Sequence, residues 1–228
     1  MPYTKDQDLS SGGYQDDRLS YTIFDSILSF LLLFLTSPLF VIVIFLVIID
    51  GTGHIFYLQD RYGKNKMIFK IYKFRSMHKE AENGRPIWGM EADPRSSSIG
   101  KFLRVTHLDE LPQLINVVKG QMSLVGPRPE RPYFAEKFKA LIPEYEERHS
   151  VKPGLTGWAQ VNGLRGESCV KERTVYDIFY VRNRSLLLNF KIILLTPLCK
   201  PIKHNHPHHQ KRRRQLLFLG LIPSLFFS

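Results

Sequence analysis

The chain has 228 residues and a net charge of +11, and six of its positive charges lie in residues 200–228, which contain no acidic residue. Its two cysteines are too few for a disulfide framework, and their spacing does not match a zinc site. The basic balance favours anionic partners, namely lipid headgroups, phosphorylated molecules or nucleic acid.

Residues 1–16 are polar and predicted to be disordered, and residues 17–26 form an amphipathic lead-in to an uncharged apolar segment over residues 27–49. This segment has the roughly 20 residues needed to cross a bilayer core, and it is too long for the apolar part of a signal peptide. Ser37-Pro38 lies about halfway along it, where proline removes a helical hydrogen bond. Two interpretations are open here: a spanning helix with a tolerated kink, or a helix-break-helix that enters and leaves by the same face.

The charges on either side of the apolar segment indicate its orientation. Residues 5–18 contain two basic and four acidic side chains, whereas residues 61–75 contain six basic ones. The positive-inside rule therefore places residues 51 onward in the cytoplasm.

Short elements follow a turn at residues 50–53. The pattern predicts strands over 55–59 and 67–74, a short helix over 76–83, a loop over 87–100, a helix over 108–118, a rigid extended segment over 125–130, and helices over 134–141 and 171–183. The short elements, the many turns and the lack of βαβ alternation argue against a doubly wound sheet. We predict a small α/β domain of the α+β kind, mostly helical with short strands.

Asp109 and Glu110 are adjacent carboxylates at the start of a predicted helix. They complement the helix dipole, or they bind a hard metal such as Mg²⁺ beside a phosphorylated ligand. Arg104 and His107 lie close upstream and favour the second interpretation, although His107 alone is better explained as structural.

Two basic segments are candidates for binding anions. Residues 126–131 present Arg128 between two prolines, which suits either bidentate phosphate binding or a surface peptide. Residues 72–77 contain Lys73 and Arg75 and form either an edge strand with solvated charges or part of an anion pocket. The neighbouring membrane segment makes lipid headgroups a better partner than nucleic acid.

Five segments then occur in an order that resembles a known family. They are KFRSM at 73–77, DPR at 93–95, LDELPQ at 108–113, SLVGPRPE at 123–130 and KPGLTGWAQ at 152–160. Over residues 18–196 the chain resembles the bacterial sugar transferase family, the monotopic polyprenyl-phosphate phosphoglycosyl transferases.

The resemblance implies an enzyme that transfers a sugar 1-phosphate from a UDP-sugar to undecaprenyl phosphate and releases UMP. That reaction begins the assembly of capsule, exopolysaccharide, O-antigen or glycoprotein glycans. The implied cofactor is Mg²⁺. The implied partners are the UDP-sugar donor, the undecaprenyl phosphate acceptor and membrane lipids, and not nucleic acid; a homodimer is compatible with the family. The family also implies a re-entrant helix broken at Ser37-Pro38, with the catalytic domain on the cytoplasmic face of the bacterial inner membrane.

The same resemblance assigns roles to residues. Asp109 would be the nucleophile that forms a covalent phospho-sugar intermediate, and Glu110 would support it, with both carboxylates available to the metal. The implied substrate- and phosphate-binding residues are Lys73, Arg75, Arg104, Arg128 and Asp177. A non-catalytic membrane scaffold for glycan assembly is the alternative function.

The expected domains are a disordered 1–16, a membrane segment 17–50, a catalytic domain 51–198 and an atypical tail 199–228. The chain departs from the family at His54, Asp60 and Asn189, and the likeness ends at Thr196. The tail is His-rich and basic, then apolar, which suits metal or membrane binding or a non-native extension. The donor sugar is not specified by these motifs.

Overall fold

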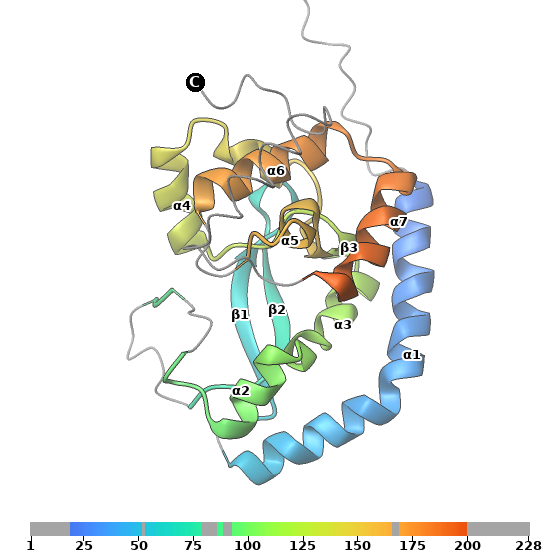
Figure 1. The fold of residues 1–228 in the computed structure, drawn as a ribbon, viewed down its shortest axis with the longest axis vertical. Coiled ribbons are helices and arrows are strands. Elements are labelled where there is room, and N and C mark those ends of the chain that lie inside the picture. Colours follow the sequence, from blue (N-terminus) through green and yellow to red (C-terminus); the bar gives the residue numbers. More distant parts are fainter. Residues whose placement is uncertain (1–18, 52, 79–85, 89–92, 166–168, 200–228) are drawn as a thin grey trace, which may run out of the picture.

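The computed structural model describes residues 19–51, 53–78, 86–88, 93–165 and 169–199. Figure 1 shows a long bent helix running along one side and the base of a domain built from short helices and two small sheets. The predicted segment 1–16 and almost all of the predicted tail 199–228 lie outside the described residues.

The described part of the chain is mostly helical, as predicted. Its helices are α1 Leu19–Asp50, α2 Ser98–Val105, α3 Gln113–Val118, α4 Pro132–Leu141, α5 Trp158–Val161, α6 Val170–Arg182 and α7 Leu186–Leu195. Single 3-10 turns are η1 Lys64–Lys66, η2 Leu108–Glu110, η3 Tyr145–His149 and η4 Thr196–Leu198. The strands are β1 Phe56–Tyr62, β2 Ile68–Phe74, β3 Ser123–Val125 and β4 Gly154–Thr156.

The two predicted strands form an antiparallel hairpin, with Phe56 opposite Phe74 and Tyr62 opposite Ile68. Side chains alternate between the faces of a strand, so residues 69, 71 and 73 share one face. Phe69 and Ile71 are buried in the main core on that face. Lys73 is therefore directed toward the interior of the domain, and its ammonium group reaches η2.

Three sequence predictions are corrected by the structure. The predicted loop 87–100 ends early, because Ser97 caps α2 by accepting a hydrogen bond from the Gly100 amide. The predicted helix 108–118 is broken into η2 and α3, with Pro112 at the N-cap of α3. Proline has no amide hydrogen to continue a helix, which explains the break. Of the predicted helix 76–83, Met77 instead forms a bridge with Ser96, and residues 79–83 lie outside the described residues.

Helix α1 has 32 residues with Pro38 inside it, and Figure 1 shows a sharp bend partway along it. Proline cannot donate to the carbonyl four residues earlier, which is that of Phe34. The Ser37 hydroxyl donates to this same carbonyl oxygen at 2.7 Å. The Ser-Pro pair thus permits the bend while the backbone acceptor keeps a partner.

The bend lets the two halves of α1 pack on different apolar clusters. Phe24, Leu28, Leu32 and Leu33 pack against the main core. The second half contributes to a smaller cluster with β2, α2 and η2, whose members are Leu39, Phe40, Val43, Ile44, Val47, Ile55, Phe74, Ile99, Leu103, Leu108 and Leu111.

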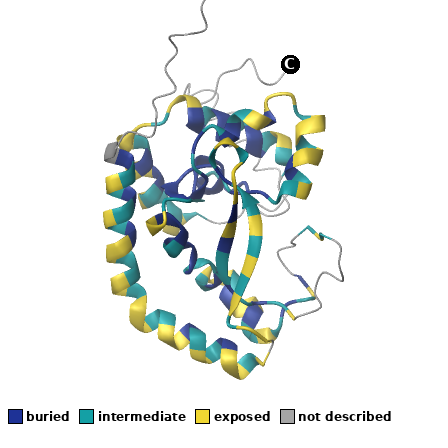
Figure 2. Ribbon diagram, turned by 180° about the vertical axis from the view of Figure 1, so that it is seen from behind, coloured by how far each residue is buried: buried dark blue, intermediate teal, exposed yellow. Residues whose placement is uncertain are grey.

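The outer side of α1 is apolar and exposed, and Figure 2 shows exposed residues along its whole length. Phe34 is 71 % exposed and Phe45 is 64 % exposed. By length and composition this helix is suited to anchor the protein in a membrane.

Both ends of α1 are hydrogen-bonded to the domain. Near its start, the buried Asp25 carboxylate accepts from the Ser123 hydroxyl at 2.6 Å and from the Leu124 amide at 3.2 Å. At its end, the Asp50 carboxylate accepts from the Ser97 hydroxyl at 2.6 Å. Both ends of α1 therefore lie against the same folded domain.

Candidate active site

The predicted carboxylate pair lies on η2, directly after a left-handed residue. His107 has a φ of 58°, which is uncommon for a residue with a side chain, and it turns the chain from α2 into η2. Leu108 and Leu111, on either side of the pair, pack in the cluster formed with the second half of α1. Asp109 and Glu110 thus lie on a turn whose apolar side chains pack against α1.

Glu110 binds two of the predicted cations. Lys73 Nζ donates to Glu110 Oε1 at 2.7 Å, and Arg128 donates from Nη1 to Oε2 at 3.2 Å and from Nη2 to Oε1. Burial opposes ionisation of this carboxyl, but the charges of Arg128 and Lys73 and their hydrogen bonds outweigh it, so the pKa of Glu110 is well below its ordinary value. Glu110 is therefore an anionic anchor for both cations.

Asp109 has the opposite surroundings. Its side chain is buried, and no hydrogen bond or ion pair to its carboxylate occurs among the described residues. Burial raises the pKa of Asp109 to about 6, and the charge of Glu110 adds to this, while Lys73 and Arg104 oppose it. Two adjacent carboxyls with pKa values pushed apart are typical of a site that assigns them different tasks. The unpaired Asp109 is the one available for chemistry.

The loop that presents Arg128 is positioned by close backbone packing. β3 and β4 pair in parallel, with Ser123 opposite Gly154. A Cβ added to Gly126 would lie 2.5 Å from the Lys152 carbonyl oxygen, and one added to Gly154 would lie 2.0 Å from the Gly126 nitrogen. These approaches leave no space for a side chain. The motif at residues 152–160 therefore supports the arginine loop.

Predicted Asp177 lies beneath this loop and does not contact Glu110. Its carboxylate accepts from Arg148 Nε at 3.1 Å and Nη2 at 2.7 Å, and Arg148 also donates to the Arg128 carbonyl oxygen at 2.8 Å. Arg173 donates to Glu130 at 2.8 Å in the same layer. Through its hydrogen bond to the Arg128 carbonyl, the buried Arg148–Asp177 ion pair fixes the backbone of the loop that presents Arg128.

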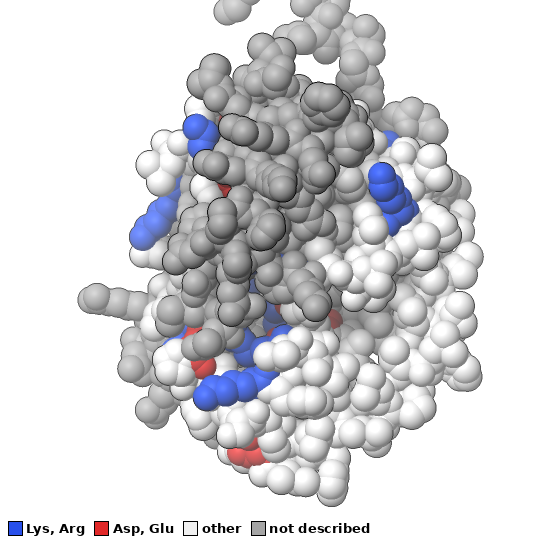
Figure 3. Space-filling view, in the orientation of Figure 1, with Lys and Arg blue, Asp and Glu red and all other residues white. Residues whose placement is uncertain are grey.

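The two remaining predicted cations lie at different places. Arg104, in the last turn of α2, is close enough to Asp109 to lower its pKa. Arg75 donates from Nε to the His54 carbonyl oxygen at 3.0 Å, at the end of the hairpin, and no contact joins it to Glu110 in the described part of the structure. In Figure 3, basic and acidic atoms gather over α2 and toward the middle of the face, whereas the side along α1 is almost entirely white.

Sequence reasoning missed Arg165, Arg148 and the position of His107. Arg165 Nη1 lies 2.9 Å from His107 Nε2. Burial lowers the pKa values of both side chains, and the nearby charge of Glu110 opposes this only in part. These residues lie in no short motif with its own chemical meaning. Their roles depend on contacts with residues far away along the chain.

Asp109 and Glu110 are the candidate ligands for the implied Mg²⁺. No group of three or more His, Cys, Asp and Glu side chains lies together within the described ranges, so these residues do not form a complete metal cage. At phosphate-binding sites Mg²⁺ commonly takes one or two carboxylates, with phosphate oxygens and water as its other ligands. The unpaired Asp109 fits that smaller set, whereas both oxygens of Glu110 already accept hydrogen bonds from Lys73 and Arg128.

The fold and the site define a class of protein. It has a long apolar helix suited to a membrane, and its folded domain places a buried carboxylate next to basic side chains that can bind an anion. Comparison with known proteins gives the family: a model of the bacterial sugar transferases matches residues 17–200, and the chain belongs to this family.

Several curated relatives are similar to the chain. It is 44 % identical over 176 residues to a UDP-glucose:undecaprenyl-phosphate glucose-1-phosphate transferase of Klebsiella pneumoniae, covering 75 % of this chain and 38 % of the relative. It is 47 % identical over 111 residues to a putative undecaprenyl-phosphate N-acetylgalactosaminyl 1-phosphate transferase of Bacillus subtilis (strain 168), covering 49 % and 62 %. It is 38 % identical over 187 residues to the exopolysaccharide production protein PSS of Rhizobium leguminosarum bv. phaseoli, covering 78 % and 92 %. The chain spans about two fifths of the length of the Klebsiella relative.

Proposed function

We propose that this chain is a phosphoglycosyl transferase that moves a sugar 1-phosphate from a UDP-sugar to undecaprenyl phosphate at the start of polysaccharide assembly. The observation that carries the proposal is the contrast between the unpaired, buried Asp109 and Glu110, which binds Lys73 and Arg128. Relatives named for this type of reaction support the substrate classes.

In the first step, an ionised Asp109 oxygen attacks the phosphorus bonded to the sugar. A new bond forms between that oxygen and phosphorus, the bond from phosphorus to the bridging oxygen of the diphosphate breaks, and UMP leaves with the bonding electrons. In the second step, an oxygen of the acceptor phosphate attacks the same phosphorus and releases the Asp109 carboxylate.

The surrounding residues stabilise charge during both steps. Lys73 and Arg128 are arranged by Glu110 and present N–H groups to phosphate oxygens. When bound, Mg²⁺ would neutralise the diphosphate and reduce its repulsion of the attacking carboxylate. Arg148 and Asp177 keep the arginine loop in place.

We also propose that α1 is re-entrant, with both of its ends on the cytoplasmic face of the inner membrane. Asp25 near its start and Asp50 at its end are both hydrogen-bonded to the same folded domain. A helix that crossed the bilayer would separate these two ends by about 30 Å of hydrocarbon. The bend at the Ser37-Pro38 region and the basic residues that follow α1 support this topology.

The activity is tested by UMP release from a panel of UDP-sugars with undecaprenyl phosphate and Mg²⁺ in detergent. We expect release by the wild-type chain, loss in Asp109→Asn, and retention in Asp60→Asn, a matched change at an exposed carboxylate paired with Lys70. Wild-type release that survives in Asp109→Asn would refute the nucleophile. A chain that binds membranes but releases no UMP from any donor would favour the scaffold alternative.

The topology is tested with single cysteines. Thr22→Cys and His54→Cys, each in a background in which Cys169 and Cys199 are replaced by serine, should both react with an impermeant thiol reagent in inside-out vesicles. Labelling of the two positions from opposite sides would show a spanning helix.

A further inference from the structure

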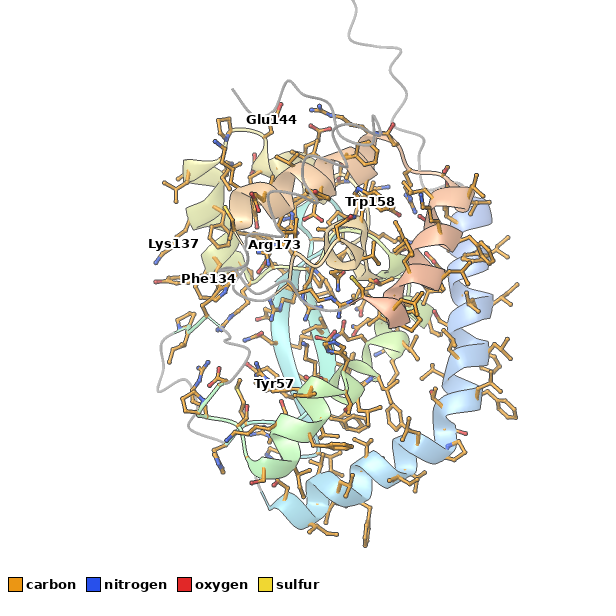
Figure 4. All side chains as sticks on the ribbon, viewed as in Figure 1. Tyr57, Phe134, Lys137, Glu144, Trp158 and Arg173 are labelled. Atoms are coloured by element: carbon orange, nitrogen blue, oxygen red, sulfur yellow. The ribbon has the colours of Figure 1, made fainter. Side chains whose placement is uncertain are left out.

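Helix α1 contains only two charged residues, Asp25 near its start and Asp50 at its end. Figure 4 shows that side chains on one side of the first half of α1 point into the domain, whereas those on the other side point away from it. Asp25 belongs to the inner side, since it is only 6 % exposed. A buried carboxylate is costly unless it is hydrogen-bonded, so the bonds that Asp25 accepts indicate what it does.

Asp25 accepts hydrogen bonds from two consecutive residues of β3. Its Oδ2 accepts from the Ser123 hydroxyl at 2.6 Å, and its Oδ1 accepts from the Leu124 amide at 3.2 Å. The Ser123 amide instead donates to the Pro153 carbonyl oxygen at 2.8 Å, on the side of β4. Successive amides of a strand point to opposite edges, and each buried amide needs an acceptor. Asp25 therefore takes the place of a neighbouring strand on the edge of β3 that β4 does not pair with.

Strand β3 leads directly to the arginine of the candidate site. Three residues separate Leu124 from Arg128, and they allow little independent movement. Pro127 has a fixed φ, and the Gly126 amide is hydrogen-bonded to β4 at 2.9 Å. Arg148 holds the same segment at the Arg128 carbonyl oxygen. A displacement of β3 would therefore be passed on to the guanidinium of Arg128.

We propose that Asp25 is a positioning residue for the active site. By fixing β3 to α1, its carboxylate places the Arg128 guanidinium where it binds a phosphate of the donor. The inference rests on the proposed function for this role of Arg128. No hydrogen bond or ion pair joins Asp25 to Arg128 among the described residues, so Asp25 acts only through the strand. Helix α1 is then part of the anion-binding site as well as a membrane anchor.

A double-mutant cycle on the binding of UDP tests the proposal without turnover. UDP carries the diphosphate common to UDP-sugars, and its affinity is measured by isothermal titration calorimetry in detergent with Mg²⁺. Asp25→Ala should weaken UDP binding about fivefold in the wild-type background and have no effect in an Arg128→Ala background. Residues that do not touch usually act additively, so loss of the Asp25 effect without Arg128 is specific to positioning.

Two milder variants keep the test decisive where Asp25→Ala does not fold. Asp25→Asn should retain wild-type UDP affinity, because its amide oxygen can accept from Leu124 and its amide nitrogen can donate to the Ser123 oxygen. Ser123→Ala removes one of the two hydrogen bonds to Asp25 and should weaken UDP binding about twofold, again only when Arg128 is present.

Asp50→Ala is the matched control at the other end of α1. Asp50 also accepts a serine hydroxyl at 2.6 Å, but that serine is Ser97 at the start of α2. Any effect of Asp50→Ala on UDP affinity should be equal in the wild-type and Arg128→Ala backgrounds. Wild-type UDP affinity in Asp25→Ala and Ser123→Ala, or an equal loss in both backgrounds, would refute the positioning role.

Steady-state transfer distinguishes this inference from the proposed function. Asp25→Ala should raise the KM for the UDP-sugar, and Asp25→Asn should leave it unchanged. Coupled loss of UDP binding without any sugar-phosphate transfer would refute the function and leave the positioning role standing. Transfer with an unaltered donor KM in Asp25→Ala would refute the positioning role and leave the function standing. A wild-type chain that does not bind UDP would refute both.

Discussion

Replacing Asp109 by asparagine should stabilise the folded protein while abolishing sugar-phosphate transfer. The wild-type carboxylate is buried and has no partner among the described residues, so its ionised form costs the folded state free energy. Asparagine has a similar shape but carries no charge. The variant therefore keeps the packing and removes the electrostatic cost.

The magnitude follows from the pKa of Asp109, which is 3.8 in the unfolded chain and about 6 in the folded one. A pKa that rises on folding means that stability decreases as pH rises between these two values and is constant above them. The difference corresponds to about 3 kcal/mol at pH 8, roughly half of that at pH 5 and only a small fraction of it at pH 4. Asp109→Asn avoids this loss, so its advantage over wild type should grow with pH.

The assay is thermal unfolding in detergent across that pH range. At pH 8 a gain of about 3 kcal/mol corresponds to a Tm increase of roughly 6 to 12 °C for a domain of this size. Asp177→Asn is the matched control, because that carboxylate is equally buried but paired with Arg148. Leaving Arg148 uncompensated should destabilise the protein by about 3–5 kcal/mol. A decrease in Tm for Asp109→Asn at pH 8, or a gain independent of pH, would refute this account of the site.

Two further predictions concern the site and its support. The rate of UMP release should rise with pH with a midpoint near pH 6, because the attacking Asp109 must be ionised. Glu110→Gln should move this midpoint to lower pH, since the charge of Glu110 raises the pKa of Asp109, and a midpoint that stayed in place would contradict the coupling. Gly126→Ala should lower the unfolding free energy by about 1–3 kcal/mol and raise the KM for the donor. The added methyl group would lie 2.5 Å from the Lys152 carbonyl oxygen and so displace the arginine loop. Wild-type stability and a wild-type KM would show that the loop adapts.

Local patterns in the sequence predicted much of the fold. An uninterrupted apolar segment predicted α1, and Ser37-Pro38 marked where its backbone hydrogen bonding changes. Alternating residues around a short turn predicted the β1–β2 hairpin. Such features depend on neighbours within a few positions, so they can be recognised without knowledge of the tertiary contacts. The broken helix at Pro112 shows the limit, since one proline fits either a first turn or a cap.

The tertiary structure decided which charged groups meet. The sequence predicted the pair Asp109 and Glu110, but their different surroundings depend on Lys73, 37 residues away from Glu110, and on Arg128, 18 residues away. Likewise, no local pattern indicates that Arg148 forms an ion pair with Asp177. The predicted Arg75 lies apart from the other predicted cations, at the end of the hairpin.

The sequence by itself predicted the apolar segment, the proline at which it bends and the identity of the candidate acids and cations. Only the tertiary structure decided that both ends of α1 are hydrogen-bonded to the domain and that Asp109 is the carboxylate of the pair without a hydrogen-bond partner among the described residues. The hydrogen bond between Asp25 and Ser123 joins residues 98 positions apart. The physical reason is that the pKa of a carboxyl and the course of a helix are set by burial and by distant charges, which exist only once the chain has folded.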